Sequence, residues 1–454
     1  MQFDMAIQGD LVLPSGVVKG GWLAIREGRI AGIFSSQERP EAHRTLDAQG
    51  KWVLPGGIDA HVHSGSNKDH PEGLFNMTRS AAAGGLTTVI DMPFDAITGP
   101  VTNVSRLKAK IQAIGQEAVI DVALYGSITK RDGTDQILPL ADGGVCAFKL
   151  STFEYDPDRF PSIPDDELIT AFGLFPKAGR PVAFHAENDE IVNALIKNLR
   201  PEGVNSAELH CISHPPIAET TSIAKLLELT RVHPIALHIA HLSVPFGYDM
   251  VNHYKSLGVD CTTETNLLYL VFVQEQMEEF KGVAKVNPPL RPREMMEELW
   301  VKLFAGEIDF IISDHAPWSA EQKNNENIFD DRPGIPGVET LLPLFYSEGV
   351  ARRGLDIQAF ARLTAEAPAK RFGLYPAKGA LWIGSDADIA ILDPGKVWRY
   401  DASKSFSTGK LTPVDGMELT GKIETTLVRG EVVFDQGEVV VPEGTGRFTR
   451  PAPA

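Results

Sequence analysis

The stretch GIDAHVH (57–63) sets the pattern from which the fold can be inferred. It is a short run with apolar and β-branched residues and polar residues at its end, which is typical of a buried strand. Seven further runs of this kind follow along the chain: TTVIDMP (87–93), DVALYG (121–126), CAFKLS (146–151), PVAFHA (181–186), IALHIAH (235–241), DCTTET (260–265) and DFIISDH (309–315). The sequence therefore offers eight candidate strands.

Segments of helical composition lie between these runs, for example at 105–117, 165–179 and 218–233. Strands that alternate with helices over about 250 residues predict an α/β fold, specifically a (β/α)8 barrel of the TIM type. A doubly wound parallel sheet is the alternative architecture. The polar stretch EQKNNENIFDDRPG (321–334) is typical of a long functional loop.

The two ends of the chain differ from this central part. Residues 1–54 alternate short apolar stretches with turn residues, and the residues from 380 onward do so again. Two strand-rich flanks predict one small β-sandwich domain built from both termini, residues 1–54 and 380–454, around a catalytic barrel of residues 55–379. Two unrelated caps are the alternative.

Composition restricts the partners and the compartment. Lys and Arg number 43 against 60 for Asp and Glu, and the net charge of -17 would repel a nucleic acid or an anionic membrane surface. The three cysteines, Cys146, Cys211 and Cys261, are widely spaced, which argues against disulfides and against a thiolate zinc site. No signal-peptide pattern and no run of about 18 apolar residues occurs. We therefore expect a cytoplasmic protein with no nucleic-acid or membrane partner.

Polar residues at the ends of the candidate strands form the candidate site, because barrel active sites lie at the carboxyl ends of the strands. His61 and His63 are two residues apart on one strand and so point the same way, toward one ion. Imidazole and carboxylate are usual ligands of zinc and other first-row metals. The sequence thus predicts a metal site without cysteine, formed by His61, His63, Lys149, His185, His241 and Asp314. Singly, each has an ordinary structural explanation; an aspartate such as Asp314, for example, often caps a helix.

Lys149 does not fit this set as an ordinary lysine. An ammonium group has three donors and no lone pair, so it would repel a cation. Lys149 lies within the apolar run CAFKLS, which predicts that it is modified or deprotonated. A lysine that neutralises a nearby carboxylate is the structural alternative.

Five of these segments resemble the signature segments of the amidohydrolase superfamily, in its cyclic amidohydrolase branch of hydantoinases, dihydropyrimidinases, allantoinases and dihydroorotases. They are GIDAHVH, CAFKLST, VAFHAEN, LHIAHLS and IISDHAP. The likeness runs from about residue 5 to residue 440 and includes AAAGGLTTVIDMP and AKVNPPLRPREMMEELW. Chance similarity over such a span is not credible.

The resemblance implies two Zn²⁺ ions bridged by N6-carboxylated Lys149 and by a hydroxide. It implies His61, His63 and Asp314 on one ion and His185 and His241 on the other. The hydroxide would be the nucleophile, since a metal lowers the pKa of bound water to about 7. Asp314 would take its proton and pass it to the leaving nitrogen.

Departures from the pattern of the branch bear on the substrate. Dihydroorotases carry an arginine two residues after the HxH motif, where this chain has Gly65, which disfavours that activity. The tyrosine that dihydropyrimidinases and D-hydantoinases place five residues after the lysine is replaced by Glu154, and Tyr155 follows one step later. Allantoinases usually show Cys-Pro-His-Tyr where this chain has residues 266–269, Asn-Leu-Leu-Tyr.

Two further segments resemble loops whose backbone binds the substrate amide, around Asn287 and around Pro333 and Gly334. With Tyr155, these residues are the predicted substrate contacts. Parts of 64–72 and 151–158 are expected to form the pocket for the ring substituent. Backbone contacts of this kind fit any cyclic amide, so they do not select among substrates.

The predicted function is the zinc-dependent opening of a hydantoin-type cyclic ureide to an N-carbamoyl amino acid or ureido acid. Hydrolysis of allantoin to allantoate is the first alternative, followed by dihydropyrimidinase and cyclic imide hydrolase activities. A different hydrolytic or deaminating reaction on the same barrel is also open. A non-catalytic assembly homologue is disfavoured, because such relatives have usually lost ligands that are all present here. A homotetramer is expected from the resemblance alone.

Overall fold

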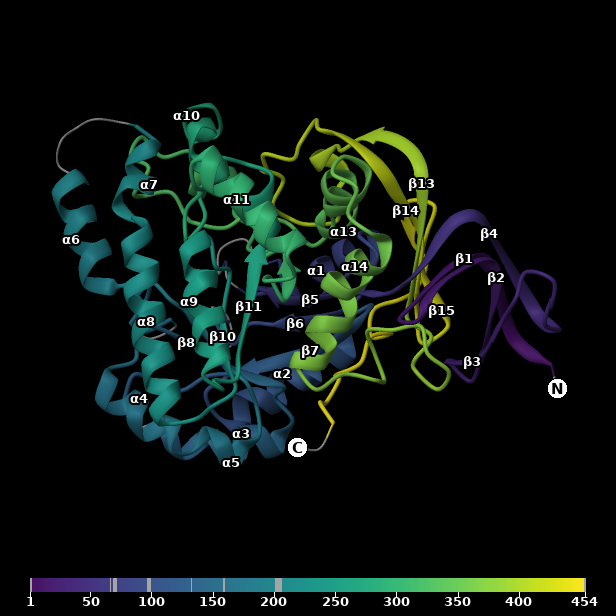
Figure 1. The fold of residues 1–454 in the computed structure, drawn as a ribbon, viewed down its shortest axis with the longest axis horizontal. Coiled ribbons are helices and arrows are strands. Elements are labelled where there is room, and N and C mark those ends of the chain that lie inside the picture. The colour runs from purple at the N-terminus through teal and green to yellow at the C-terminus, as the bar shows by residue number, and fades with distance from the viewer. Residues whose placement is uncertain are drawn as a thin grey trace.

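The structure, a computed structural model, describes residues 2–65, 67, 72–95, 99–131, 133–157, 160–200 and 206–452. It contains two eight-stranded sheets (Figure 1). One sheet forms the barrel of the central part of the chain, and the other combines strands from both ends. Within the described part of the chain, no helix has the length and apolar character needed to cross a membrane.

The barrel strands follow one another in sequence order, and each pairs in parallel with the next. A parallel bridge between Val62 and His315 links the first strand to the segment after the eighth. The predicted barrel is thus confirmed, and each candidate strand overlaps an observed one. The strands are β5 (Gly57–Val62), β6 (Leu86–Asp91), β7 (Asp121–Gly126), β8 (Ala147–Ser151), β9 (Val182–His185), β10 (Leu237–Ile239), β11 (Cys261–Asn266) and β12 (Phe310–Ile312).

Helices cover the outside of the barrel (Figure 1). Capping side chains start several of them: Asn103 accepts the backbone N–H of Arg106 in α2, and Asn188 accepts that of Ile191 in α6. The helices are α1 (Gly73–Ala83), α2 (Val104–Glu117), α3 (Ile137–Gly143), α4 (Asp165–Phe172), α5 (Phe175–Ala178), α6 (Asp189–Leu199), α7 (Glu208–Ser213), α8 (Pro216–Val232), α9 (Pro245–Ser256), α10 (Met277–Phe280), α11 (Arg293–Phe304), α12 (Ala320–Lys323), α13 (Leu341–Phe345), α14 (Ile357–Ala361) and α15 (Ala367–Arg371).

The terminal sheet has the order β16-β15-β14-β13-β4-β1-β2-β3. Its two halves join where β4 pairs antiparallel with β13, so strands from opposite ends of the chain lie side by side (Figure 1). Apolar residues from both halves form one core, as the prediction of a small β domain from both termini requires. The strands are β1 (Phe3–Leu13), β2 (Gly16–Arg26), β3 (Arg29–Phe34), β4 (Ala42–Pro55), β13 (Ile389–Arg399), β14 (Glu418–Val428), β15 (Glu431–Asp435) and β16 (Glu438–Val439).

The last described residues leave this sheet and return to the barrel. The Val122 N–H donates to the Arg447 carbonyl at 2.9 Å, and the Thr449 N–H donates to the Val122 carbonyl at 2.9 Å. Val122 lies at the start of β7, so this tail covers the amino-terminal end of the barrel. The domain limits at residues 54/55 and 379/380 stay a prediction. The tail belongs to the C-terminal part of the predicted β domain but contacts the barrel.

Candidate active site

One cavity at the carboxyl ends of the barrel strands brings the predicted site residues together. Two of the predicted metal ligands end or nearly end their strands, His61 in β5 and His185 in β9. Two others, His241 and Asp314, come two residues after β10 and β12. The cavity is lined by all ten predicted residues, namely His61, His63, Lys149, Tyr155, His185, His241, Asn287, Asp314, Pro333 and Gly334. The structure places these ten residues around one cavity, and their roles stay predictions.

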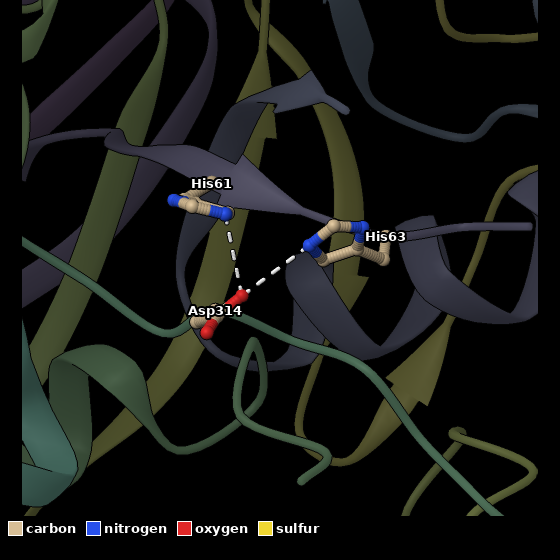
Figure 2. Close-up of side chains that lie close together, drawn as sticks. All are labelled: His61, His63 and Asp314. Carbon is tan, nitrogen blue, oxygen red and sulfur yellow. Dashed lines mark ion pairs between the residues drawn. The ribbon is translucent and has the colours of Figure 1, made fainter. Parts of the chain in front are cut away.

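His61, His63 and Asp314 form the first half of the candidate metal centre (Figure 2). The Asp314 Oδ1 atom lies 3.3 Å from His61 Nε2 and 3.4 Å from His63 Nε2. One ligand atom from each residue lies within 4.8 Å of the others, which is close enough for a single ion. Burial, aided by the charge of Lys149, holds the pKa of His61 well below its usual range, so its imidazole is neutral.

His185 and His241 form the second half. The His185 Nδ1 and His241 Nε2 atoms lie 3.0 Å apart, and the other nitrogen of His185 donates to Glu187 at 2.7 Å. Burial alone would raise the pKa of Glu187, but His214 and His185 hold it well below its usual range. Glu187 is therefore a carboxylate that only accepts, so a neutral His185 carries its proton on Nε2 and presents the Nδ1 lone pair to the site.

Lys149 lies among these groups with its ammonium unsatisfied. The side chain is 1% exposed, and its Nζ atom has no hydrogen-bond partner among the described residues. Burial lowers the pKa of Lys149 to about 8, which leaves part of the amine uncharged near neutral pH. No carboxylate of the described residues forms a hydrogen bond with Nζ, although the charges of Glu264 and Asp314 act to raise the pKa of Lys149.

Two buried glutamates orient the histidines, and the sequence analysis missed both. Glu187 links His185 to His214, whose Nδ1 lies 2.7 Å from the second carboxylate oxygen. Glu264 of β11 lies 2.6 Å from His61 Nδ1, so the Nε2 atom of His61 faces Asp314. The spacing H-x-E in VAFHAEN could have indicated Glu187, since residues two apart on an extended chain share a side. No sequence signal links Glu264 to His61.

The backbone is strained at two of the candidate ligands. His241 has φ 34° and Asp314 has φ 51°, values that residues other than glycine rarely adopt. Strain of this kind costs on the order of 1–3 kcal/mol and occurs mainly where function requires a particular orientation. Both side chains turn into the cavity at these positions.

Glu154 and Tyr155, where the chain departs from the pattern of the branch that it resembles, point in different directions. Glu154 turns away from the cavity and pairs with Lys130, whereas Tyr155 lines the cavity. The Tyr155 hydroxyl accepts a hydrogen bond from Arg332 Nη1 at 3.0 Å. A phenol is therefore present at the site one residue later than in the pattern of the branch.

Gly65 has no room for the arginine of dihydroorotases. A Cβ atom there would lie 2.6 Å from the Asp95 carboxyl carbon. Asp95 is buried and receives a hydrogen bond from Lys110 at 2.9 Å, so it cannot move aside at low cost. A larger side chain at position 65 would therefore have to displace Asp95, and the expectation that dihydroorotase activity is disfavoured stays a prediction.

Four aromatic side chains form most of the remaining wall of the cavity: Phe94, Phe153, Phe160 and Trp318. The ring centroids of Phe94 and Phe160 are 4.2 Å apart, and those of Phe153 and His185 are 5.9 Å apart. The substituent pocket was expected from parts of 64–72 and 151–158. Phe153 and Tyr155 of the second segment line the cavity, whereas residues 66, 68–71 and 158 lie outside the described residues.

Comparisons with known proteins agree with this site. The sequence profile of the amidohydrolase family matches residues 52–433. The chain is 34% identical over 450 residues to the L-hydantoinase of Paenarthrobacter aurescens, with 98% of both chains covered. It is 34% identical over 455 residues to the allantoinase of Deinococcus radiodurans, with 99% of both chains covered. Identity to the allantoinase of Solibacter usitatus is 32% over 449 residues, 99% of this chain and 97% of the relative.

Solved structures share the whole architecture. The L-hydantoinase (dihydropyrimidinase) from Arthrobacter aurescens superposes with a TM-score of 0.95 at 34% identity, over 99% of this chain and 100% of that chain. The dihydropyrimidinase from Brevibacillus agri NCHU1002 has a TM-score of 0.91 at 25% identity, with 99% of both chains covered. Because the family profile and the relatives extend over nearly the full length, the chain belongs to the amidohydrolase family.

Proposed function

We propose that the protein hydrolyses the amide C–N bond of a hydantoin-type cyclic ureide to give an N-carbamoyl amino acid. The observation that carries this proposal is the aromatic-walled cavity into which four histidines, Lys149 and Asp314 converge. Similar relatives named L-hydantoinase and allantoinase support hydrolysis of a cyclic amide.

The donor set fits a pair of zinc ions. His61, His63 and Asp314 would hold one ion, His185 and His241 the other, and a carboxylated Lys149 both. The fit rests on two features of the chain: an unpartnered, partly uncharged amine at Lys149, which can react with CO2, and the Nδ1 lone pair of His185 that faces His241. When bound, the ions would polarise the scissile carbonyl and lower the pKa of a water molecule.

Asp314 is placed to move the proton. One carboxylate oxygen lies beside the two histidines, and the side chain is 13% exposed, so it reaches the cavity. In the proposed reaction, Asp314 accepts a proton from the attacking water and delivers it to the ring nitrogen as the C–N bond breaks. The water oxygen ends in the new carboxylic acid, which releases its remaining proton to solvent, and the ring N–H gains the transferred proton and ends as the NH2 of the carbamoyl group.

Two polar groups of the cavity would contact the substrate, Asn287 Oδ1 and the Tyr155 hydroxyl. The Asn287 Oδ1 atom is buried without a hydrogen-bond partner among the described residues. A ring N–H would satisfy this acceptor, whose burial without a partner otherwise costs about 1–3 kcal/mol. The Tyr155 hydroxyl, held by Arg332, would donate to the oxygen of the scissile carbonyl.

The aromatic wall favours an apolar ring substituent. Phe94, Phe153, Phe160 and Trp318 offer flat apolar surfaces, which suit an aryl or alkyl group at carbon 5 of the ring. The ureido group of allantoin would lose its water there without gaining matching polar partners. Allantoin is retained as the second candidate because several of the similar relatives are named allantoinase.

A substrate panel tests the proposal. Opening of 5-benzylhydantoin, allantoin, dihydrouracil and succinimide should be measured under one set of conditions, and we expect the highest kcat/KM for 5-benzylhydantoin. Preference for allantoin would replace the first candidate by the second. Absence of ring opening on the whole panel, with metal bound, would refute cyclic amide hydrolysis.

Metal removal provides an independent test. The isolated protein should hold about two equivalents of zinc, since the site offers more ligands than one tetrahedral ion uses. Dialysis against a chelator should abolish activity, and added Zn²⁺ should restore it. One equivalent of metal at full activity, measured by elemental analysis, would contradict the two-ion site.

We also propose a cytoplasmic location and a homotetramer. The three cysteines are buried and unpaired, as expected for a reducing compartment. Apolar side chains exposed on neighbouring helices, Phe246 of α9 with Val301 and Phe304 of α11, offer a surface for association. Light scattering of the purified protein measures the oligomer number. The proposed ligand is a small cyclic ureide or imide, and the net charge of -17 disfavours nucleic acid.

A further inference from the structure

Two segments that face the cavity are tied together by one buried lysine. The first segment, 285–287, ends in Asn287, and the second, 332–334, contains Pro333 and Gly334. Between them lies Lys323, the last residue of α12, with a side chain that is 1% exposed. No function described above uses this lysine.

The Lys323 ammonium donates to three backbone carbonyls and to no side chain. It bonds the carbonyls of Lys285 at 3.1 Å, Arg332 at 3.0 Å and Gly334 at 2.7 Å. Three N–H groups thus meet three acceptors, one from the first segment and two from the second. The Lys285 carbonyl also accepts the Gly334 N–H at 2.9 Å, which joins the two segments directly.

Lys285 completes the arrangement from the opposite side. Its own ammonium donates to the carbonyls of Ile328 at 2.7 Å and Asp331 at 2.6 Å, in the loop that leads to Pro333. Two buried lysines therefore bind five backbone carbonyls of this region. Because each carbonyl is satisfied by a fixed donor, the loop holds one position relative to residues 285–287.

These bonds also select which backbone group can face a substrate. The N–H and carbonyl of Gly334 are both engaged, with Lys285 and Lys323. Pro333 has no N–H, and its carbonyl accepts Trp318 Nε1–H at 2.7 Å. A carbonyl has a second lone pair, and Pro333 lines the cavity, so its oxygen is an acceptor of this segment that can take a ring N–H.

We propose that Lys323 is a positioning residue that sets the distance between the Pro333 carbonyl and Asn287, and so determines the affinity for the ring amide. This inference rests on the proposed hydrolysis of a cyclic amide. Lys323 does not touch the substrate. It acts by holding the two backbone segments that do.

The test uses the full-length, metal-loaded protein and the substituted hydantoin that the wild type opens. Lys323→Met keeps the length of the side chain and removes all three donors. We expect KM to rise about tenfold or more and kcat to change by less than about threefold, because contacts shared by the ground state and the transition state are lost. Lys323→Gln, with two donors on a shorter chain, should give an intermediate KM.

A second readout separates positioning from a loss of folded protein. The ratio of kcat/KM for the hydantoin to that for its N-methylated form does not depend on the concentration of active enzyme. Loss of the fixed acceptor should lower this ratio in Lys323→Met. Lys302→Met is the matched control, since the Lys302 ammonium binds Asp249 and Glu307 and does not line the cavity. Its KM and ratio should equal those of the wild type.

The outcomes distinguish this inference from the function on which it rests. A wild-type protein that opens no ring refutes the proposed function. An active wild type with unchanged KM and ratio in Lys323→Met overturns the role of Lys323 alone. Failure of both Lys323 variants to fold would also overturn it, because the lysine would then be required by the whole fold and not by the substrate segments.

Discussion

The surroundings of Lys149 differ from those of an ordinary lysine. It is fully buried, has no hydrogen-bond partner among the described residues, and lies among candidate metal ligands. An unsatisfied ammonium group at this position would be costly. A carbamate formed from the uncharged amine would offer two oxygens that could bind the metal ions.

Exchange of Lys149 tests this chemistry. Lys149→Arg keeps a positive charge and cannot form the carbamate, so we expect loss of zinc and of activity. Lys149→Ala should lose both as well, and acetate or propionate should restore part of the activity by supplying carboxylate oxygens. Zinc content and ring opening are the measurements. Two zinc ions with substantial activity in Lys149→Arg would exclude the carbamate.

Asp314 is expected to combine two roles that a single substitution can separate. Asp314→Asn keeps an oxygen for the metal but cannot accept the proton. Turnover should therefore fall by about 10²–10⁴-fold, while most of the metal is retained. Elemental analysis and kcat are measured on the same sample. A variant with both metals and near-normal kcat would show that another group is the base.

Sequence patterns located the candidate ligands but not the groups that orient them. His61, Lys149 and Asp314 stand out because each is a polar residue in or just after a recognisable apolar strand. Glu187 and Glu264 meet their histidines only through the fold; Glu264 is 203 positions from His61 in sequence and 2.6 Å away in space. Pairings of this kind depend on the barrel register, which a single sequence does not contain.

At the scale of elements, the loop that carries Pro333 and Gly334 depends on one glycine. Gly334 has φ +126°, and a Cβ atom there would lie 2.6 Å from Ala316 Cβ and 2.8 Å from Trp318 Nε1. Gly334→Ala should displace the loop and weaken its bond to Trp318. We expect a higher KM for the hydantoin and a lower midpoint of thermal unfolding.

Gly306→Ala is the control for this substitution. Gly306 has φ +75°, and a Cβ atom there would meet nothing within 4 Å. Its exchange should cost only the backbone strain of about 1 kcal/mol and leave KM unchanged. Equal effects of the two substitutions on KM would show that the close contact at Gly334 does not set the position of the loop.

The element predictions succeeded where hydrophobic runs were short and bounded by turns, as in all eight barrel strands. They were less accurate where a helix depends on packing. The segment 165–179 was expected to be one helix, but it forms α4 and α5 with a break at Gly173 and Leu174. Glycine lowers helix stability, and Pro176 at the start of α5 favours a new helix start there.

At the scale of the whole molecule, a buried charge cluster links the barrel to the terminal sheet. Lys378 lies 2.8 Å from Asp121 at the start of β7, and 2.6 Å from Asp388, which directly precedes β13. Asp386 lies 3.3 Å away. Although burial alone would raise it, Lys378 and Arg429 hold the pKa of Asp121 below its usual value.

Lys378→Met should destabilise the protein strongly, because it leaves carboxylates buried without their cation. We expect a loss of about 3–5 kcal/mol, seen as a lower midpoint of thermal unfolding, with kcat per folded molecule unchanged. Lys19→Met is the control: Lys19 pairs with Asp10 at the surface with 67% of its side chain exposed. Removal of that pair should cost at most about 1 kcal/mol. Equal midpoints for the two variants would refute the linking role of the cluster.

The same cluster predicts a dependence on pH. A carboxyl group with a lowered folded-state pKa contributes stability above its unfolded value of about 3.9, and that contribution is lost as the pH falls through the folded-state pKa. The wild type should therefore lose the contribution of Asp121 only in strong acid. In Lys378→Met, protonation removes the charge of the unpaired buried carboxylates. The difference in free energy of unfolding between this variant and the wild type should therefore shrink as the pH falls from 7 to 4. A difference that grows on acidification would contradict this assignment.

The pairing of β4 with β13 has a consequence for synthesis on the ribosome. Strands β1 to β4 emerge first, but Pro55 and its neighbours in β4 wait for a partner that begins at Ile389. At about 5–20 residues per second, the roughly 330 residues between them take on the order of 20–70 s. Throughout that interval the nascent chain exposes a strand edge that could pair with other chains. Translation of the last strands closes that edge, so the polypeptide is most vulnerable to aggregation while its barrel is being made.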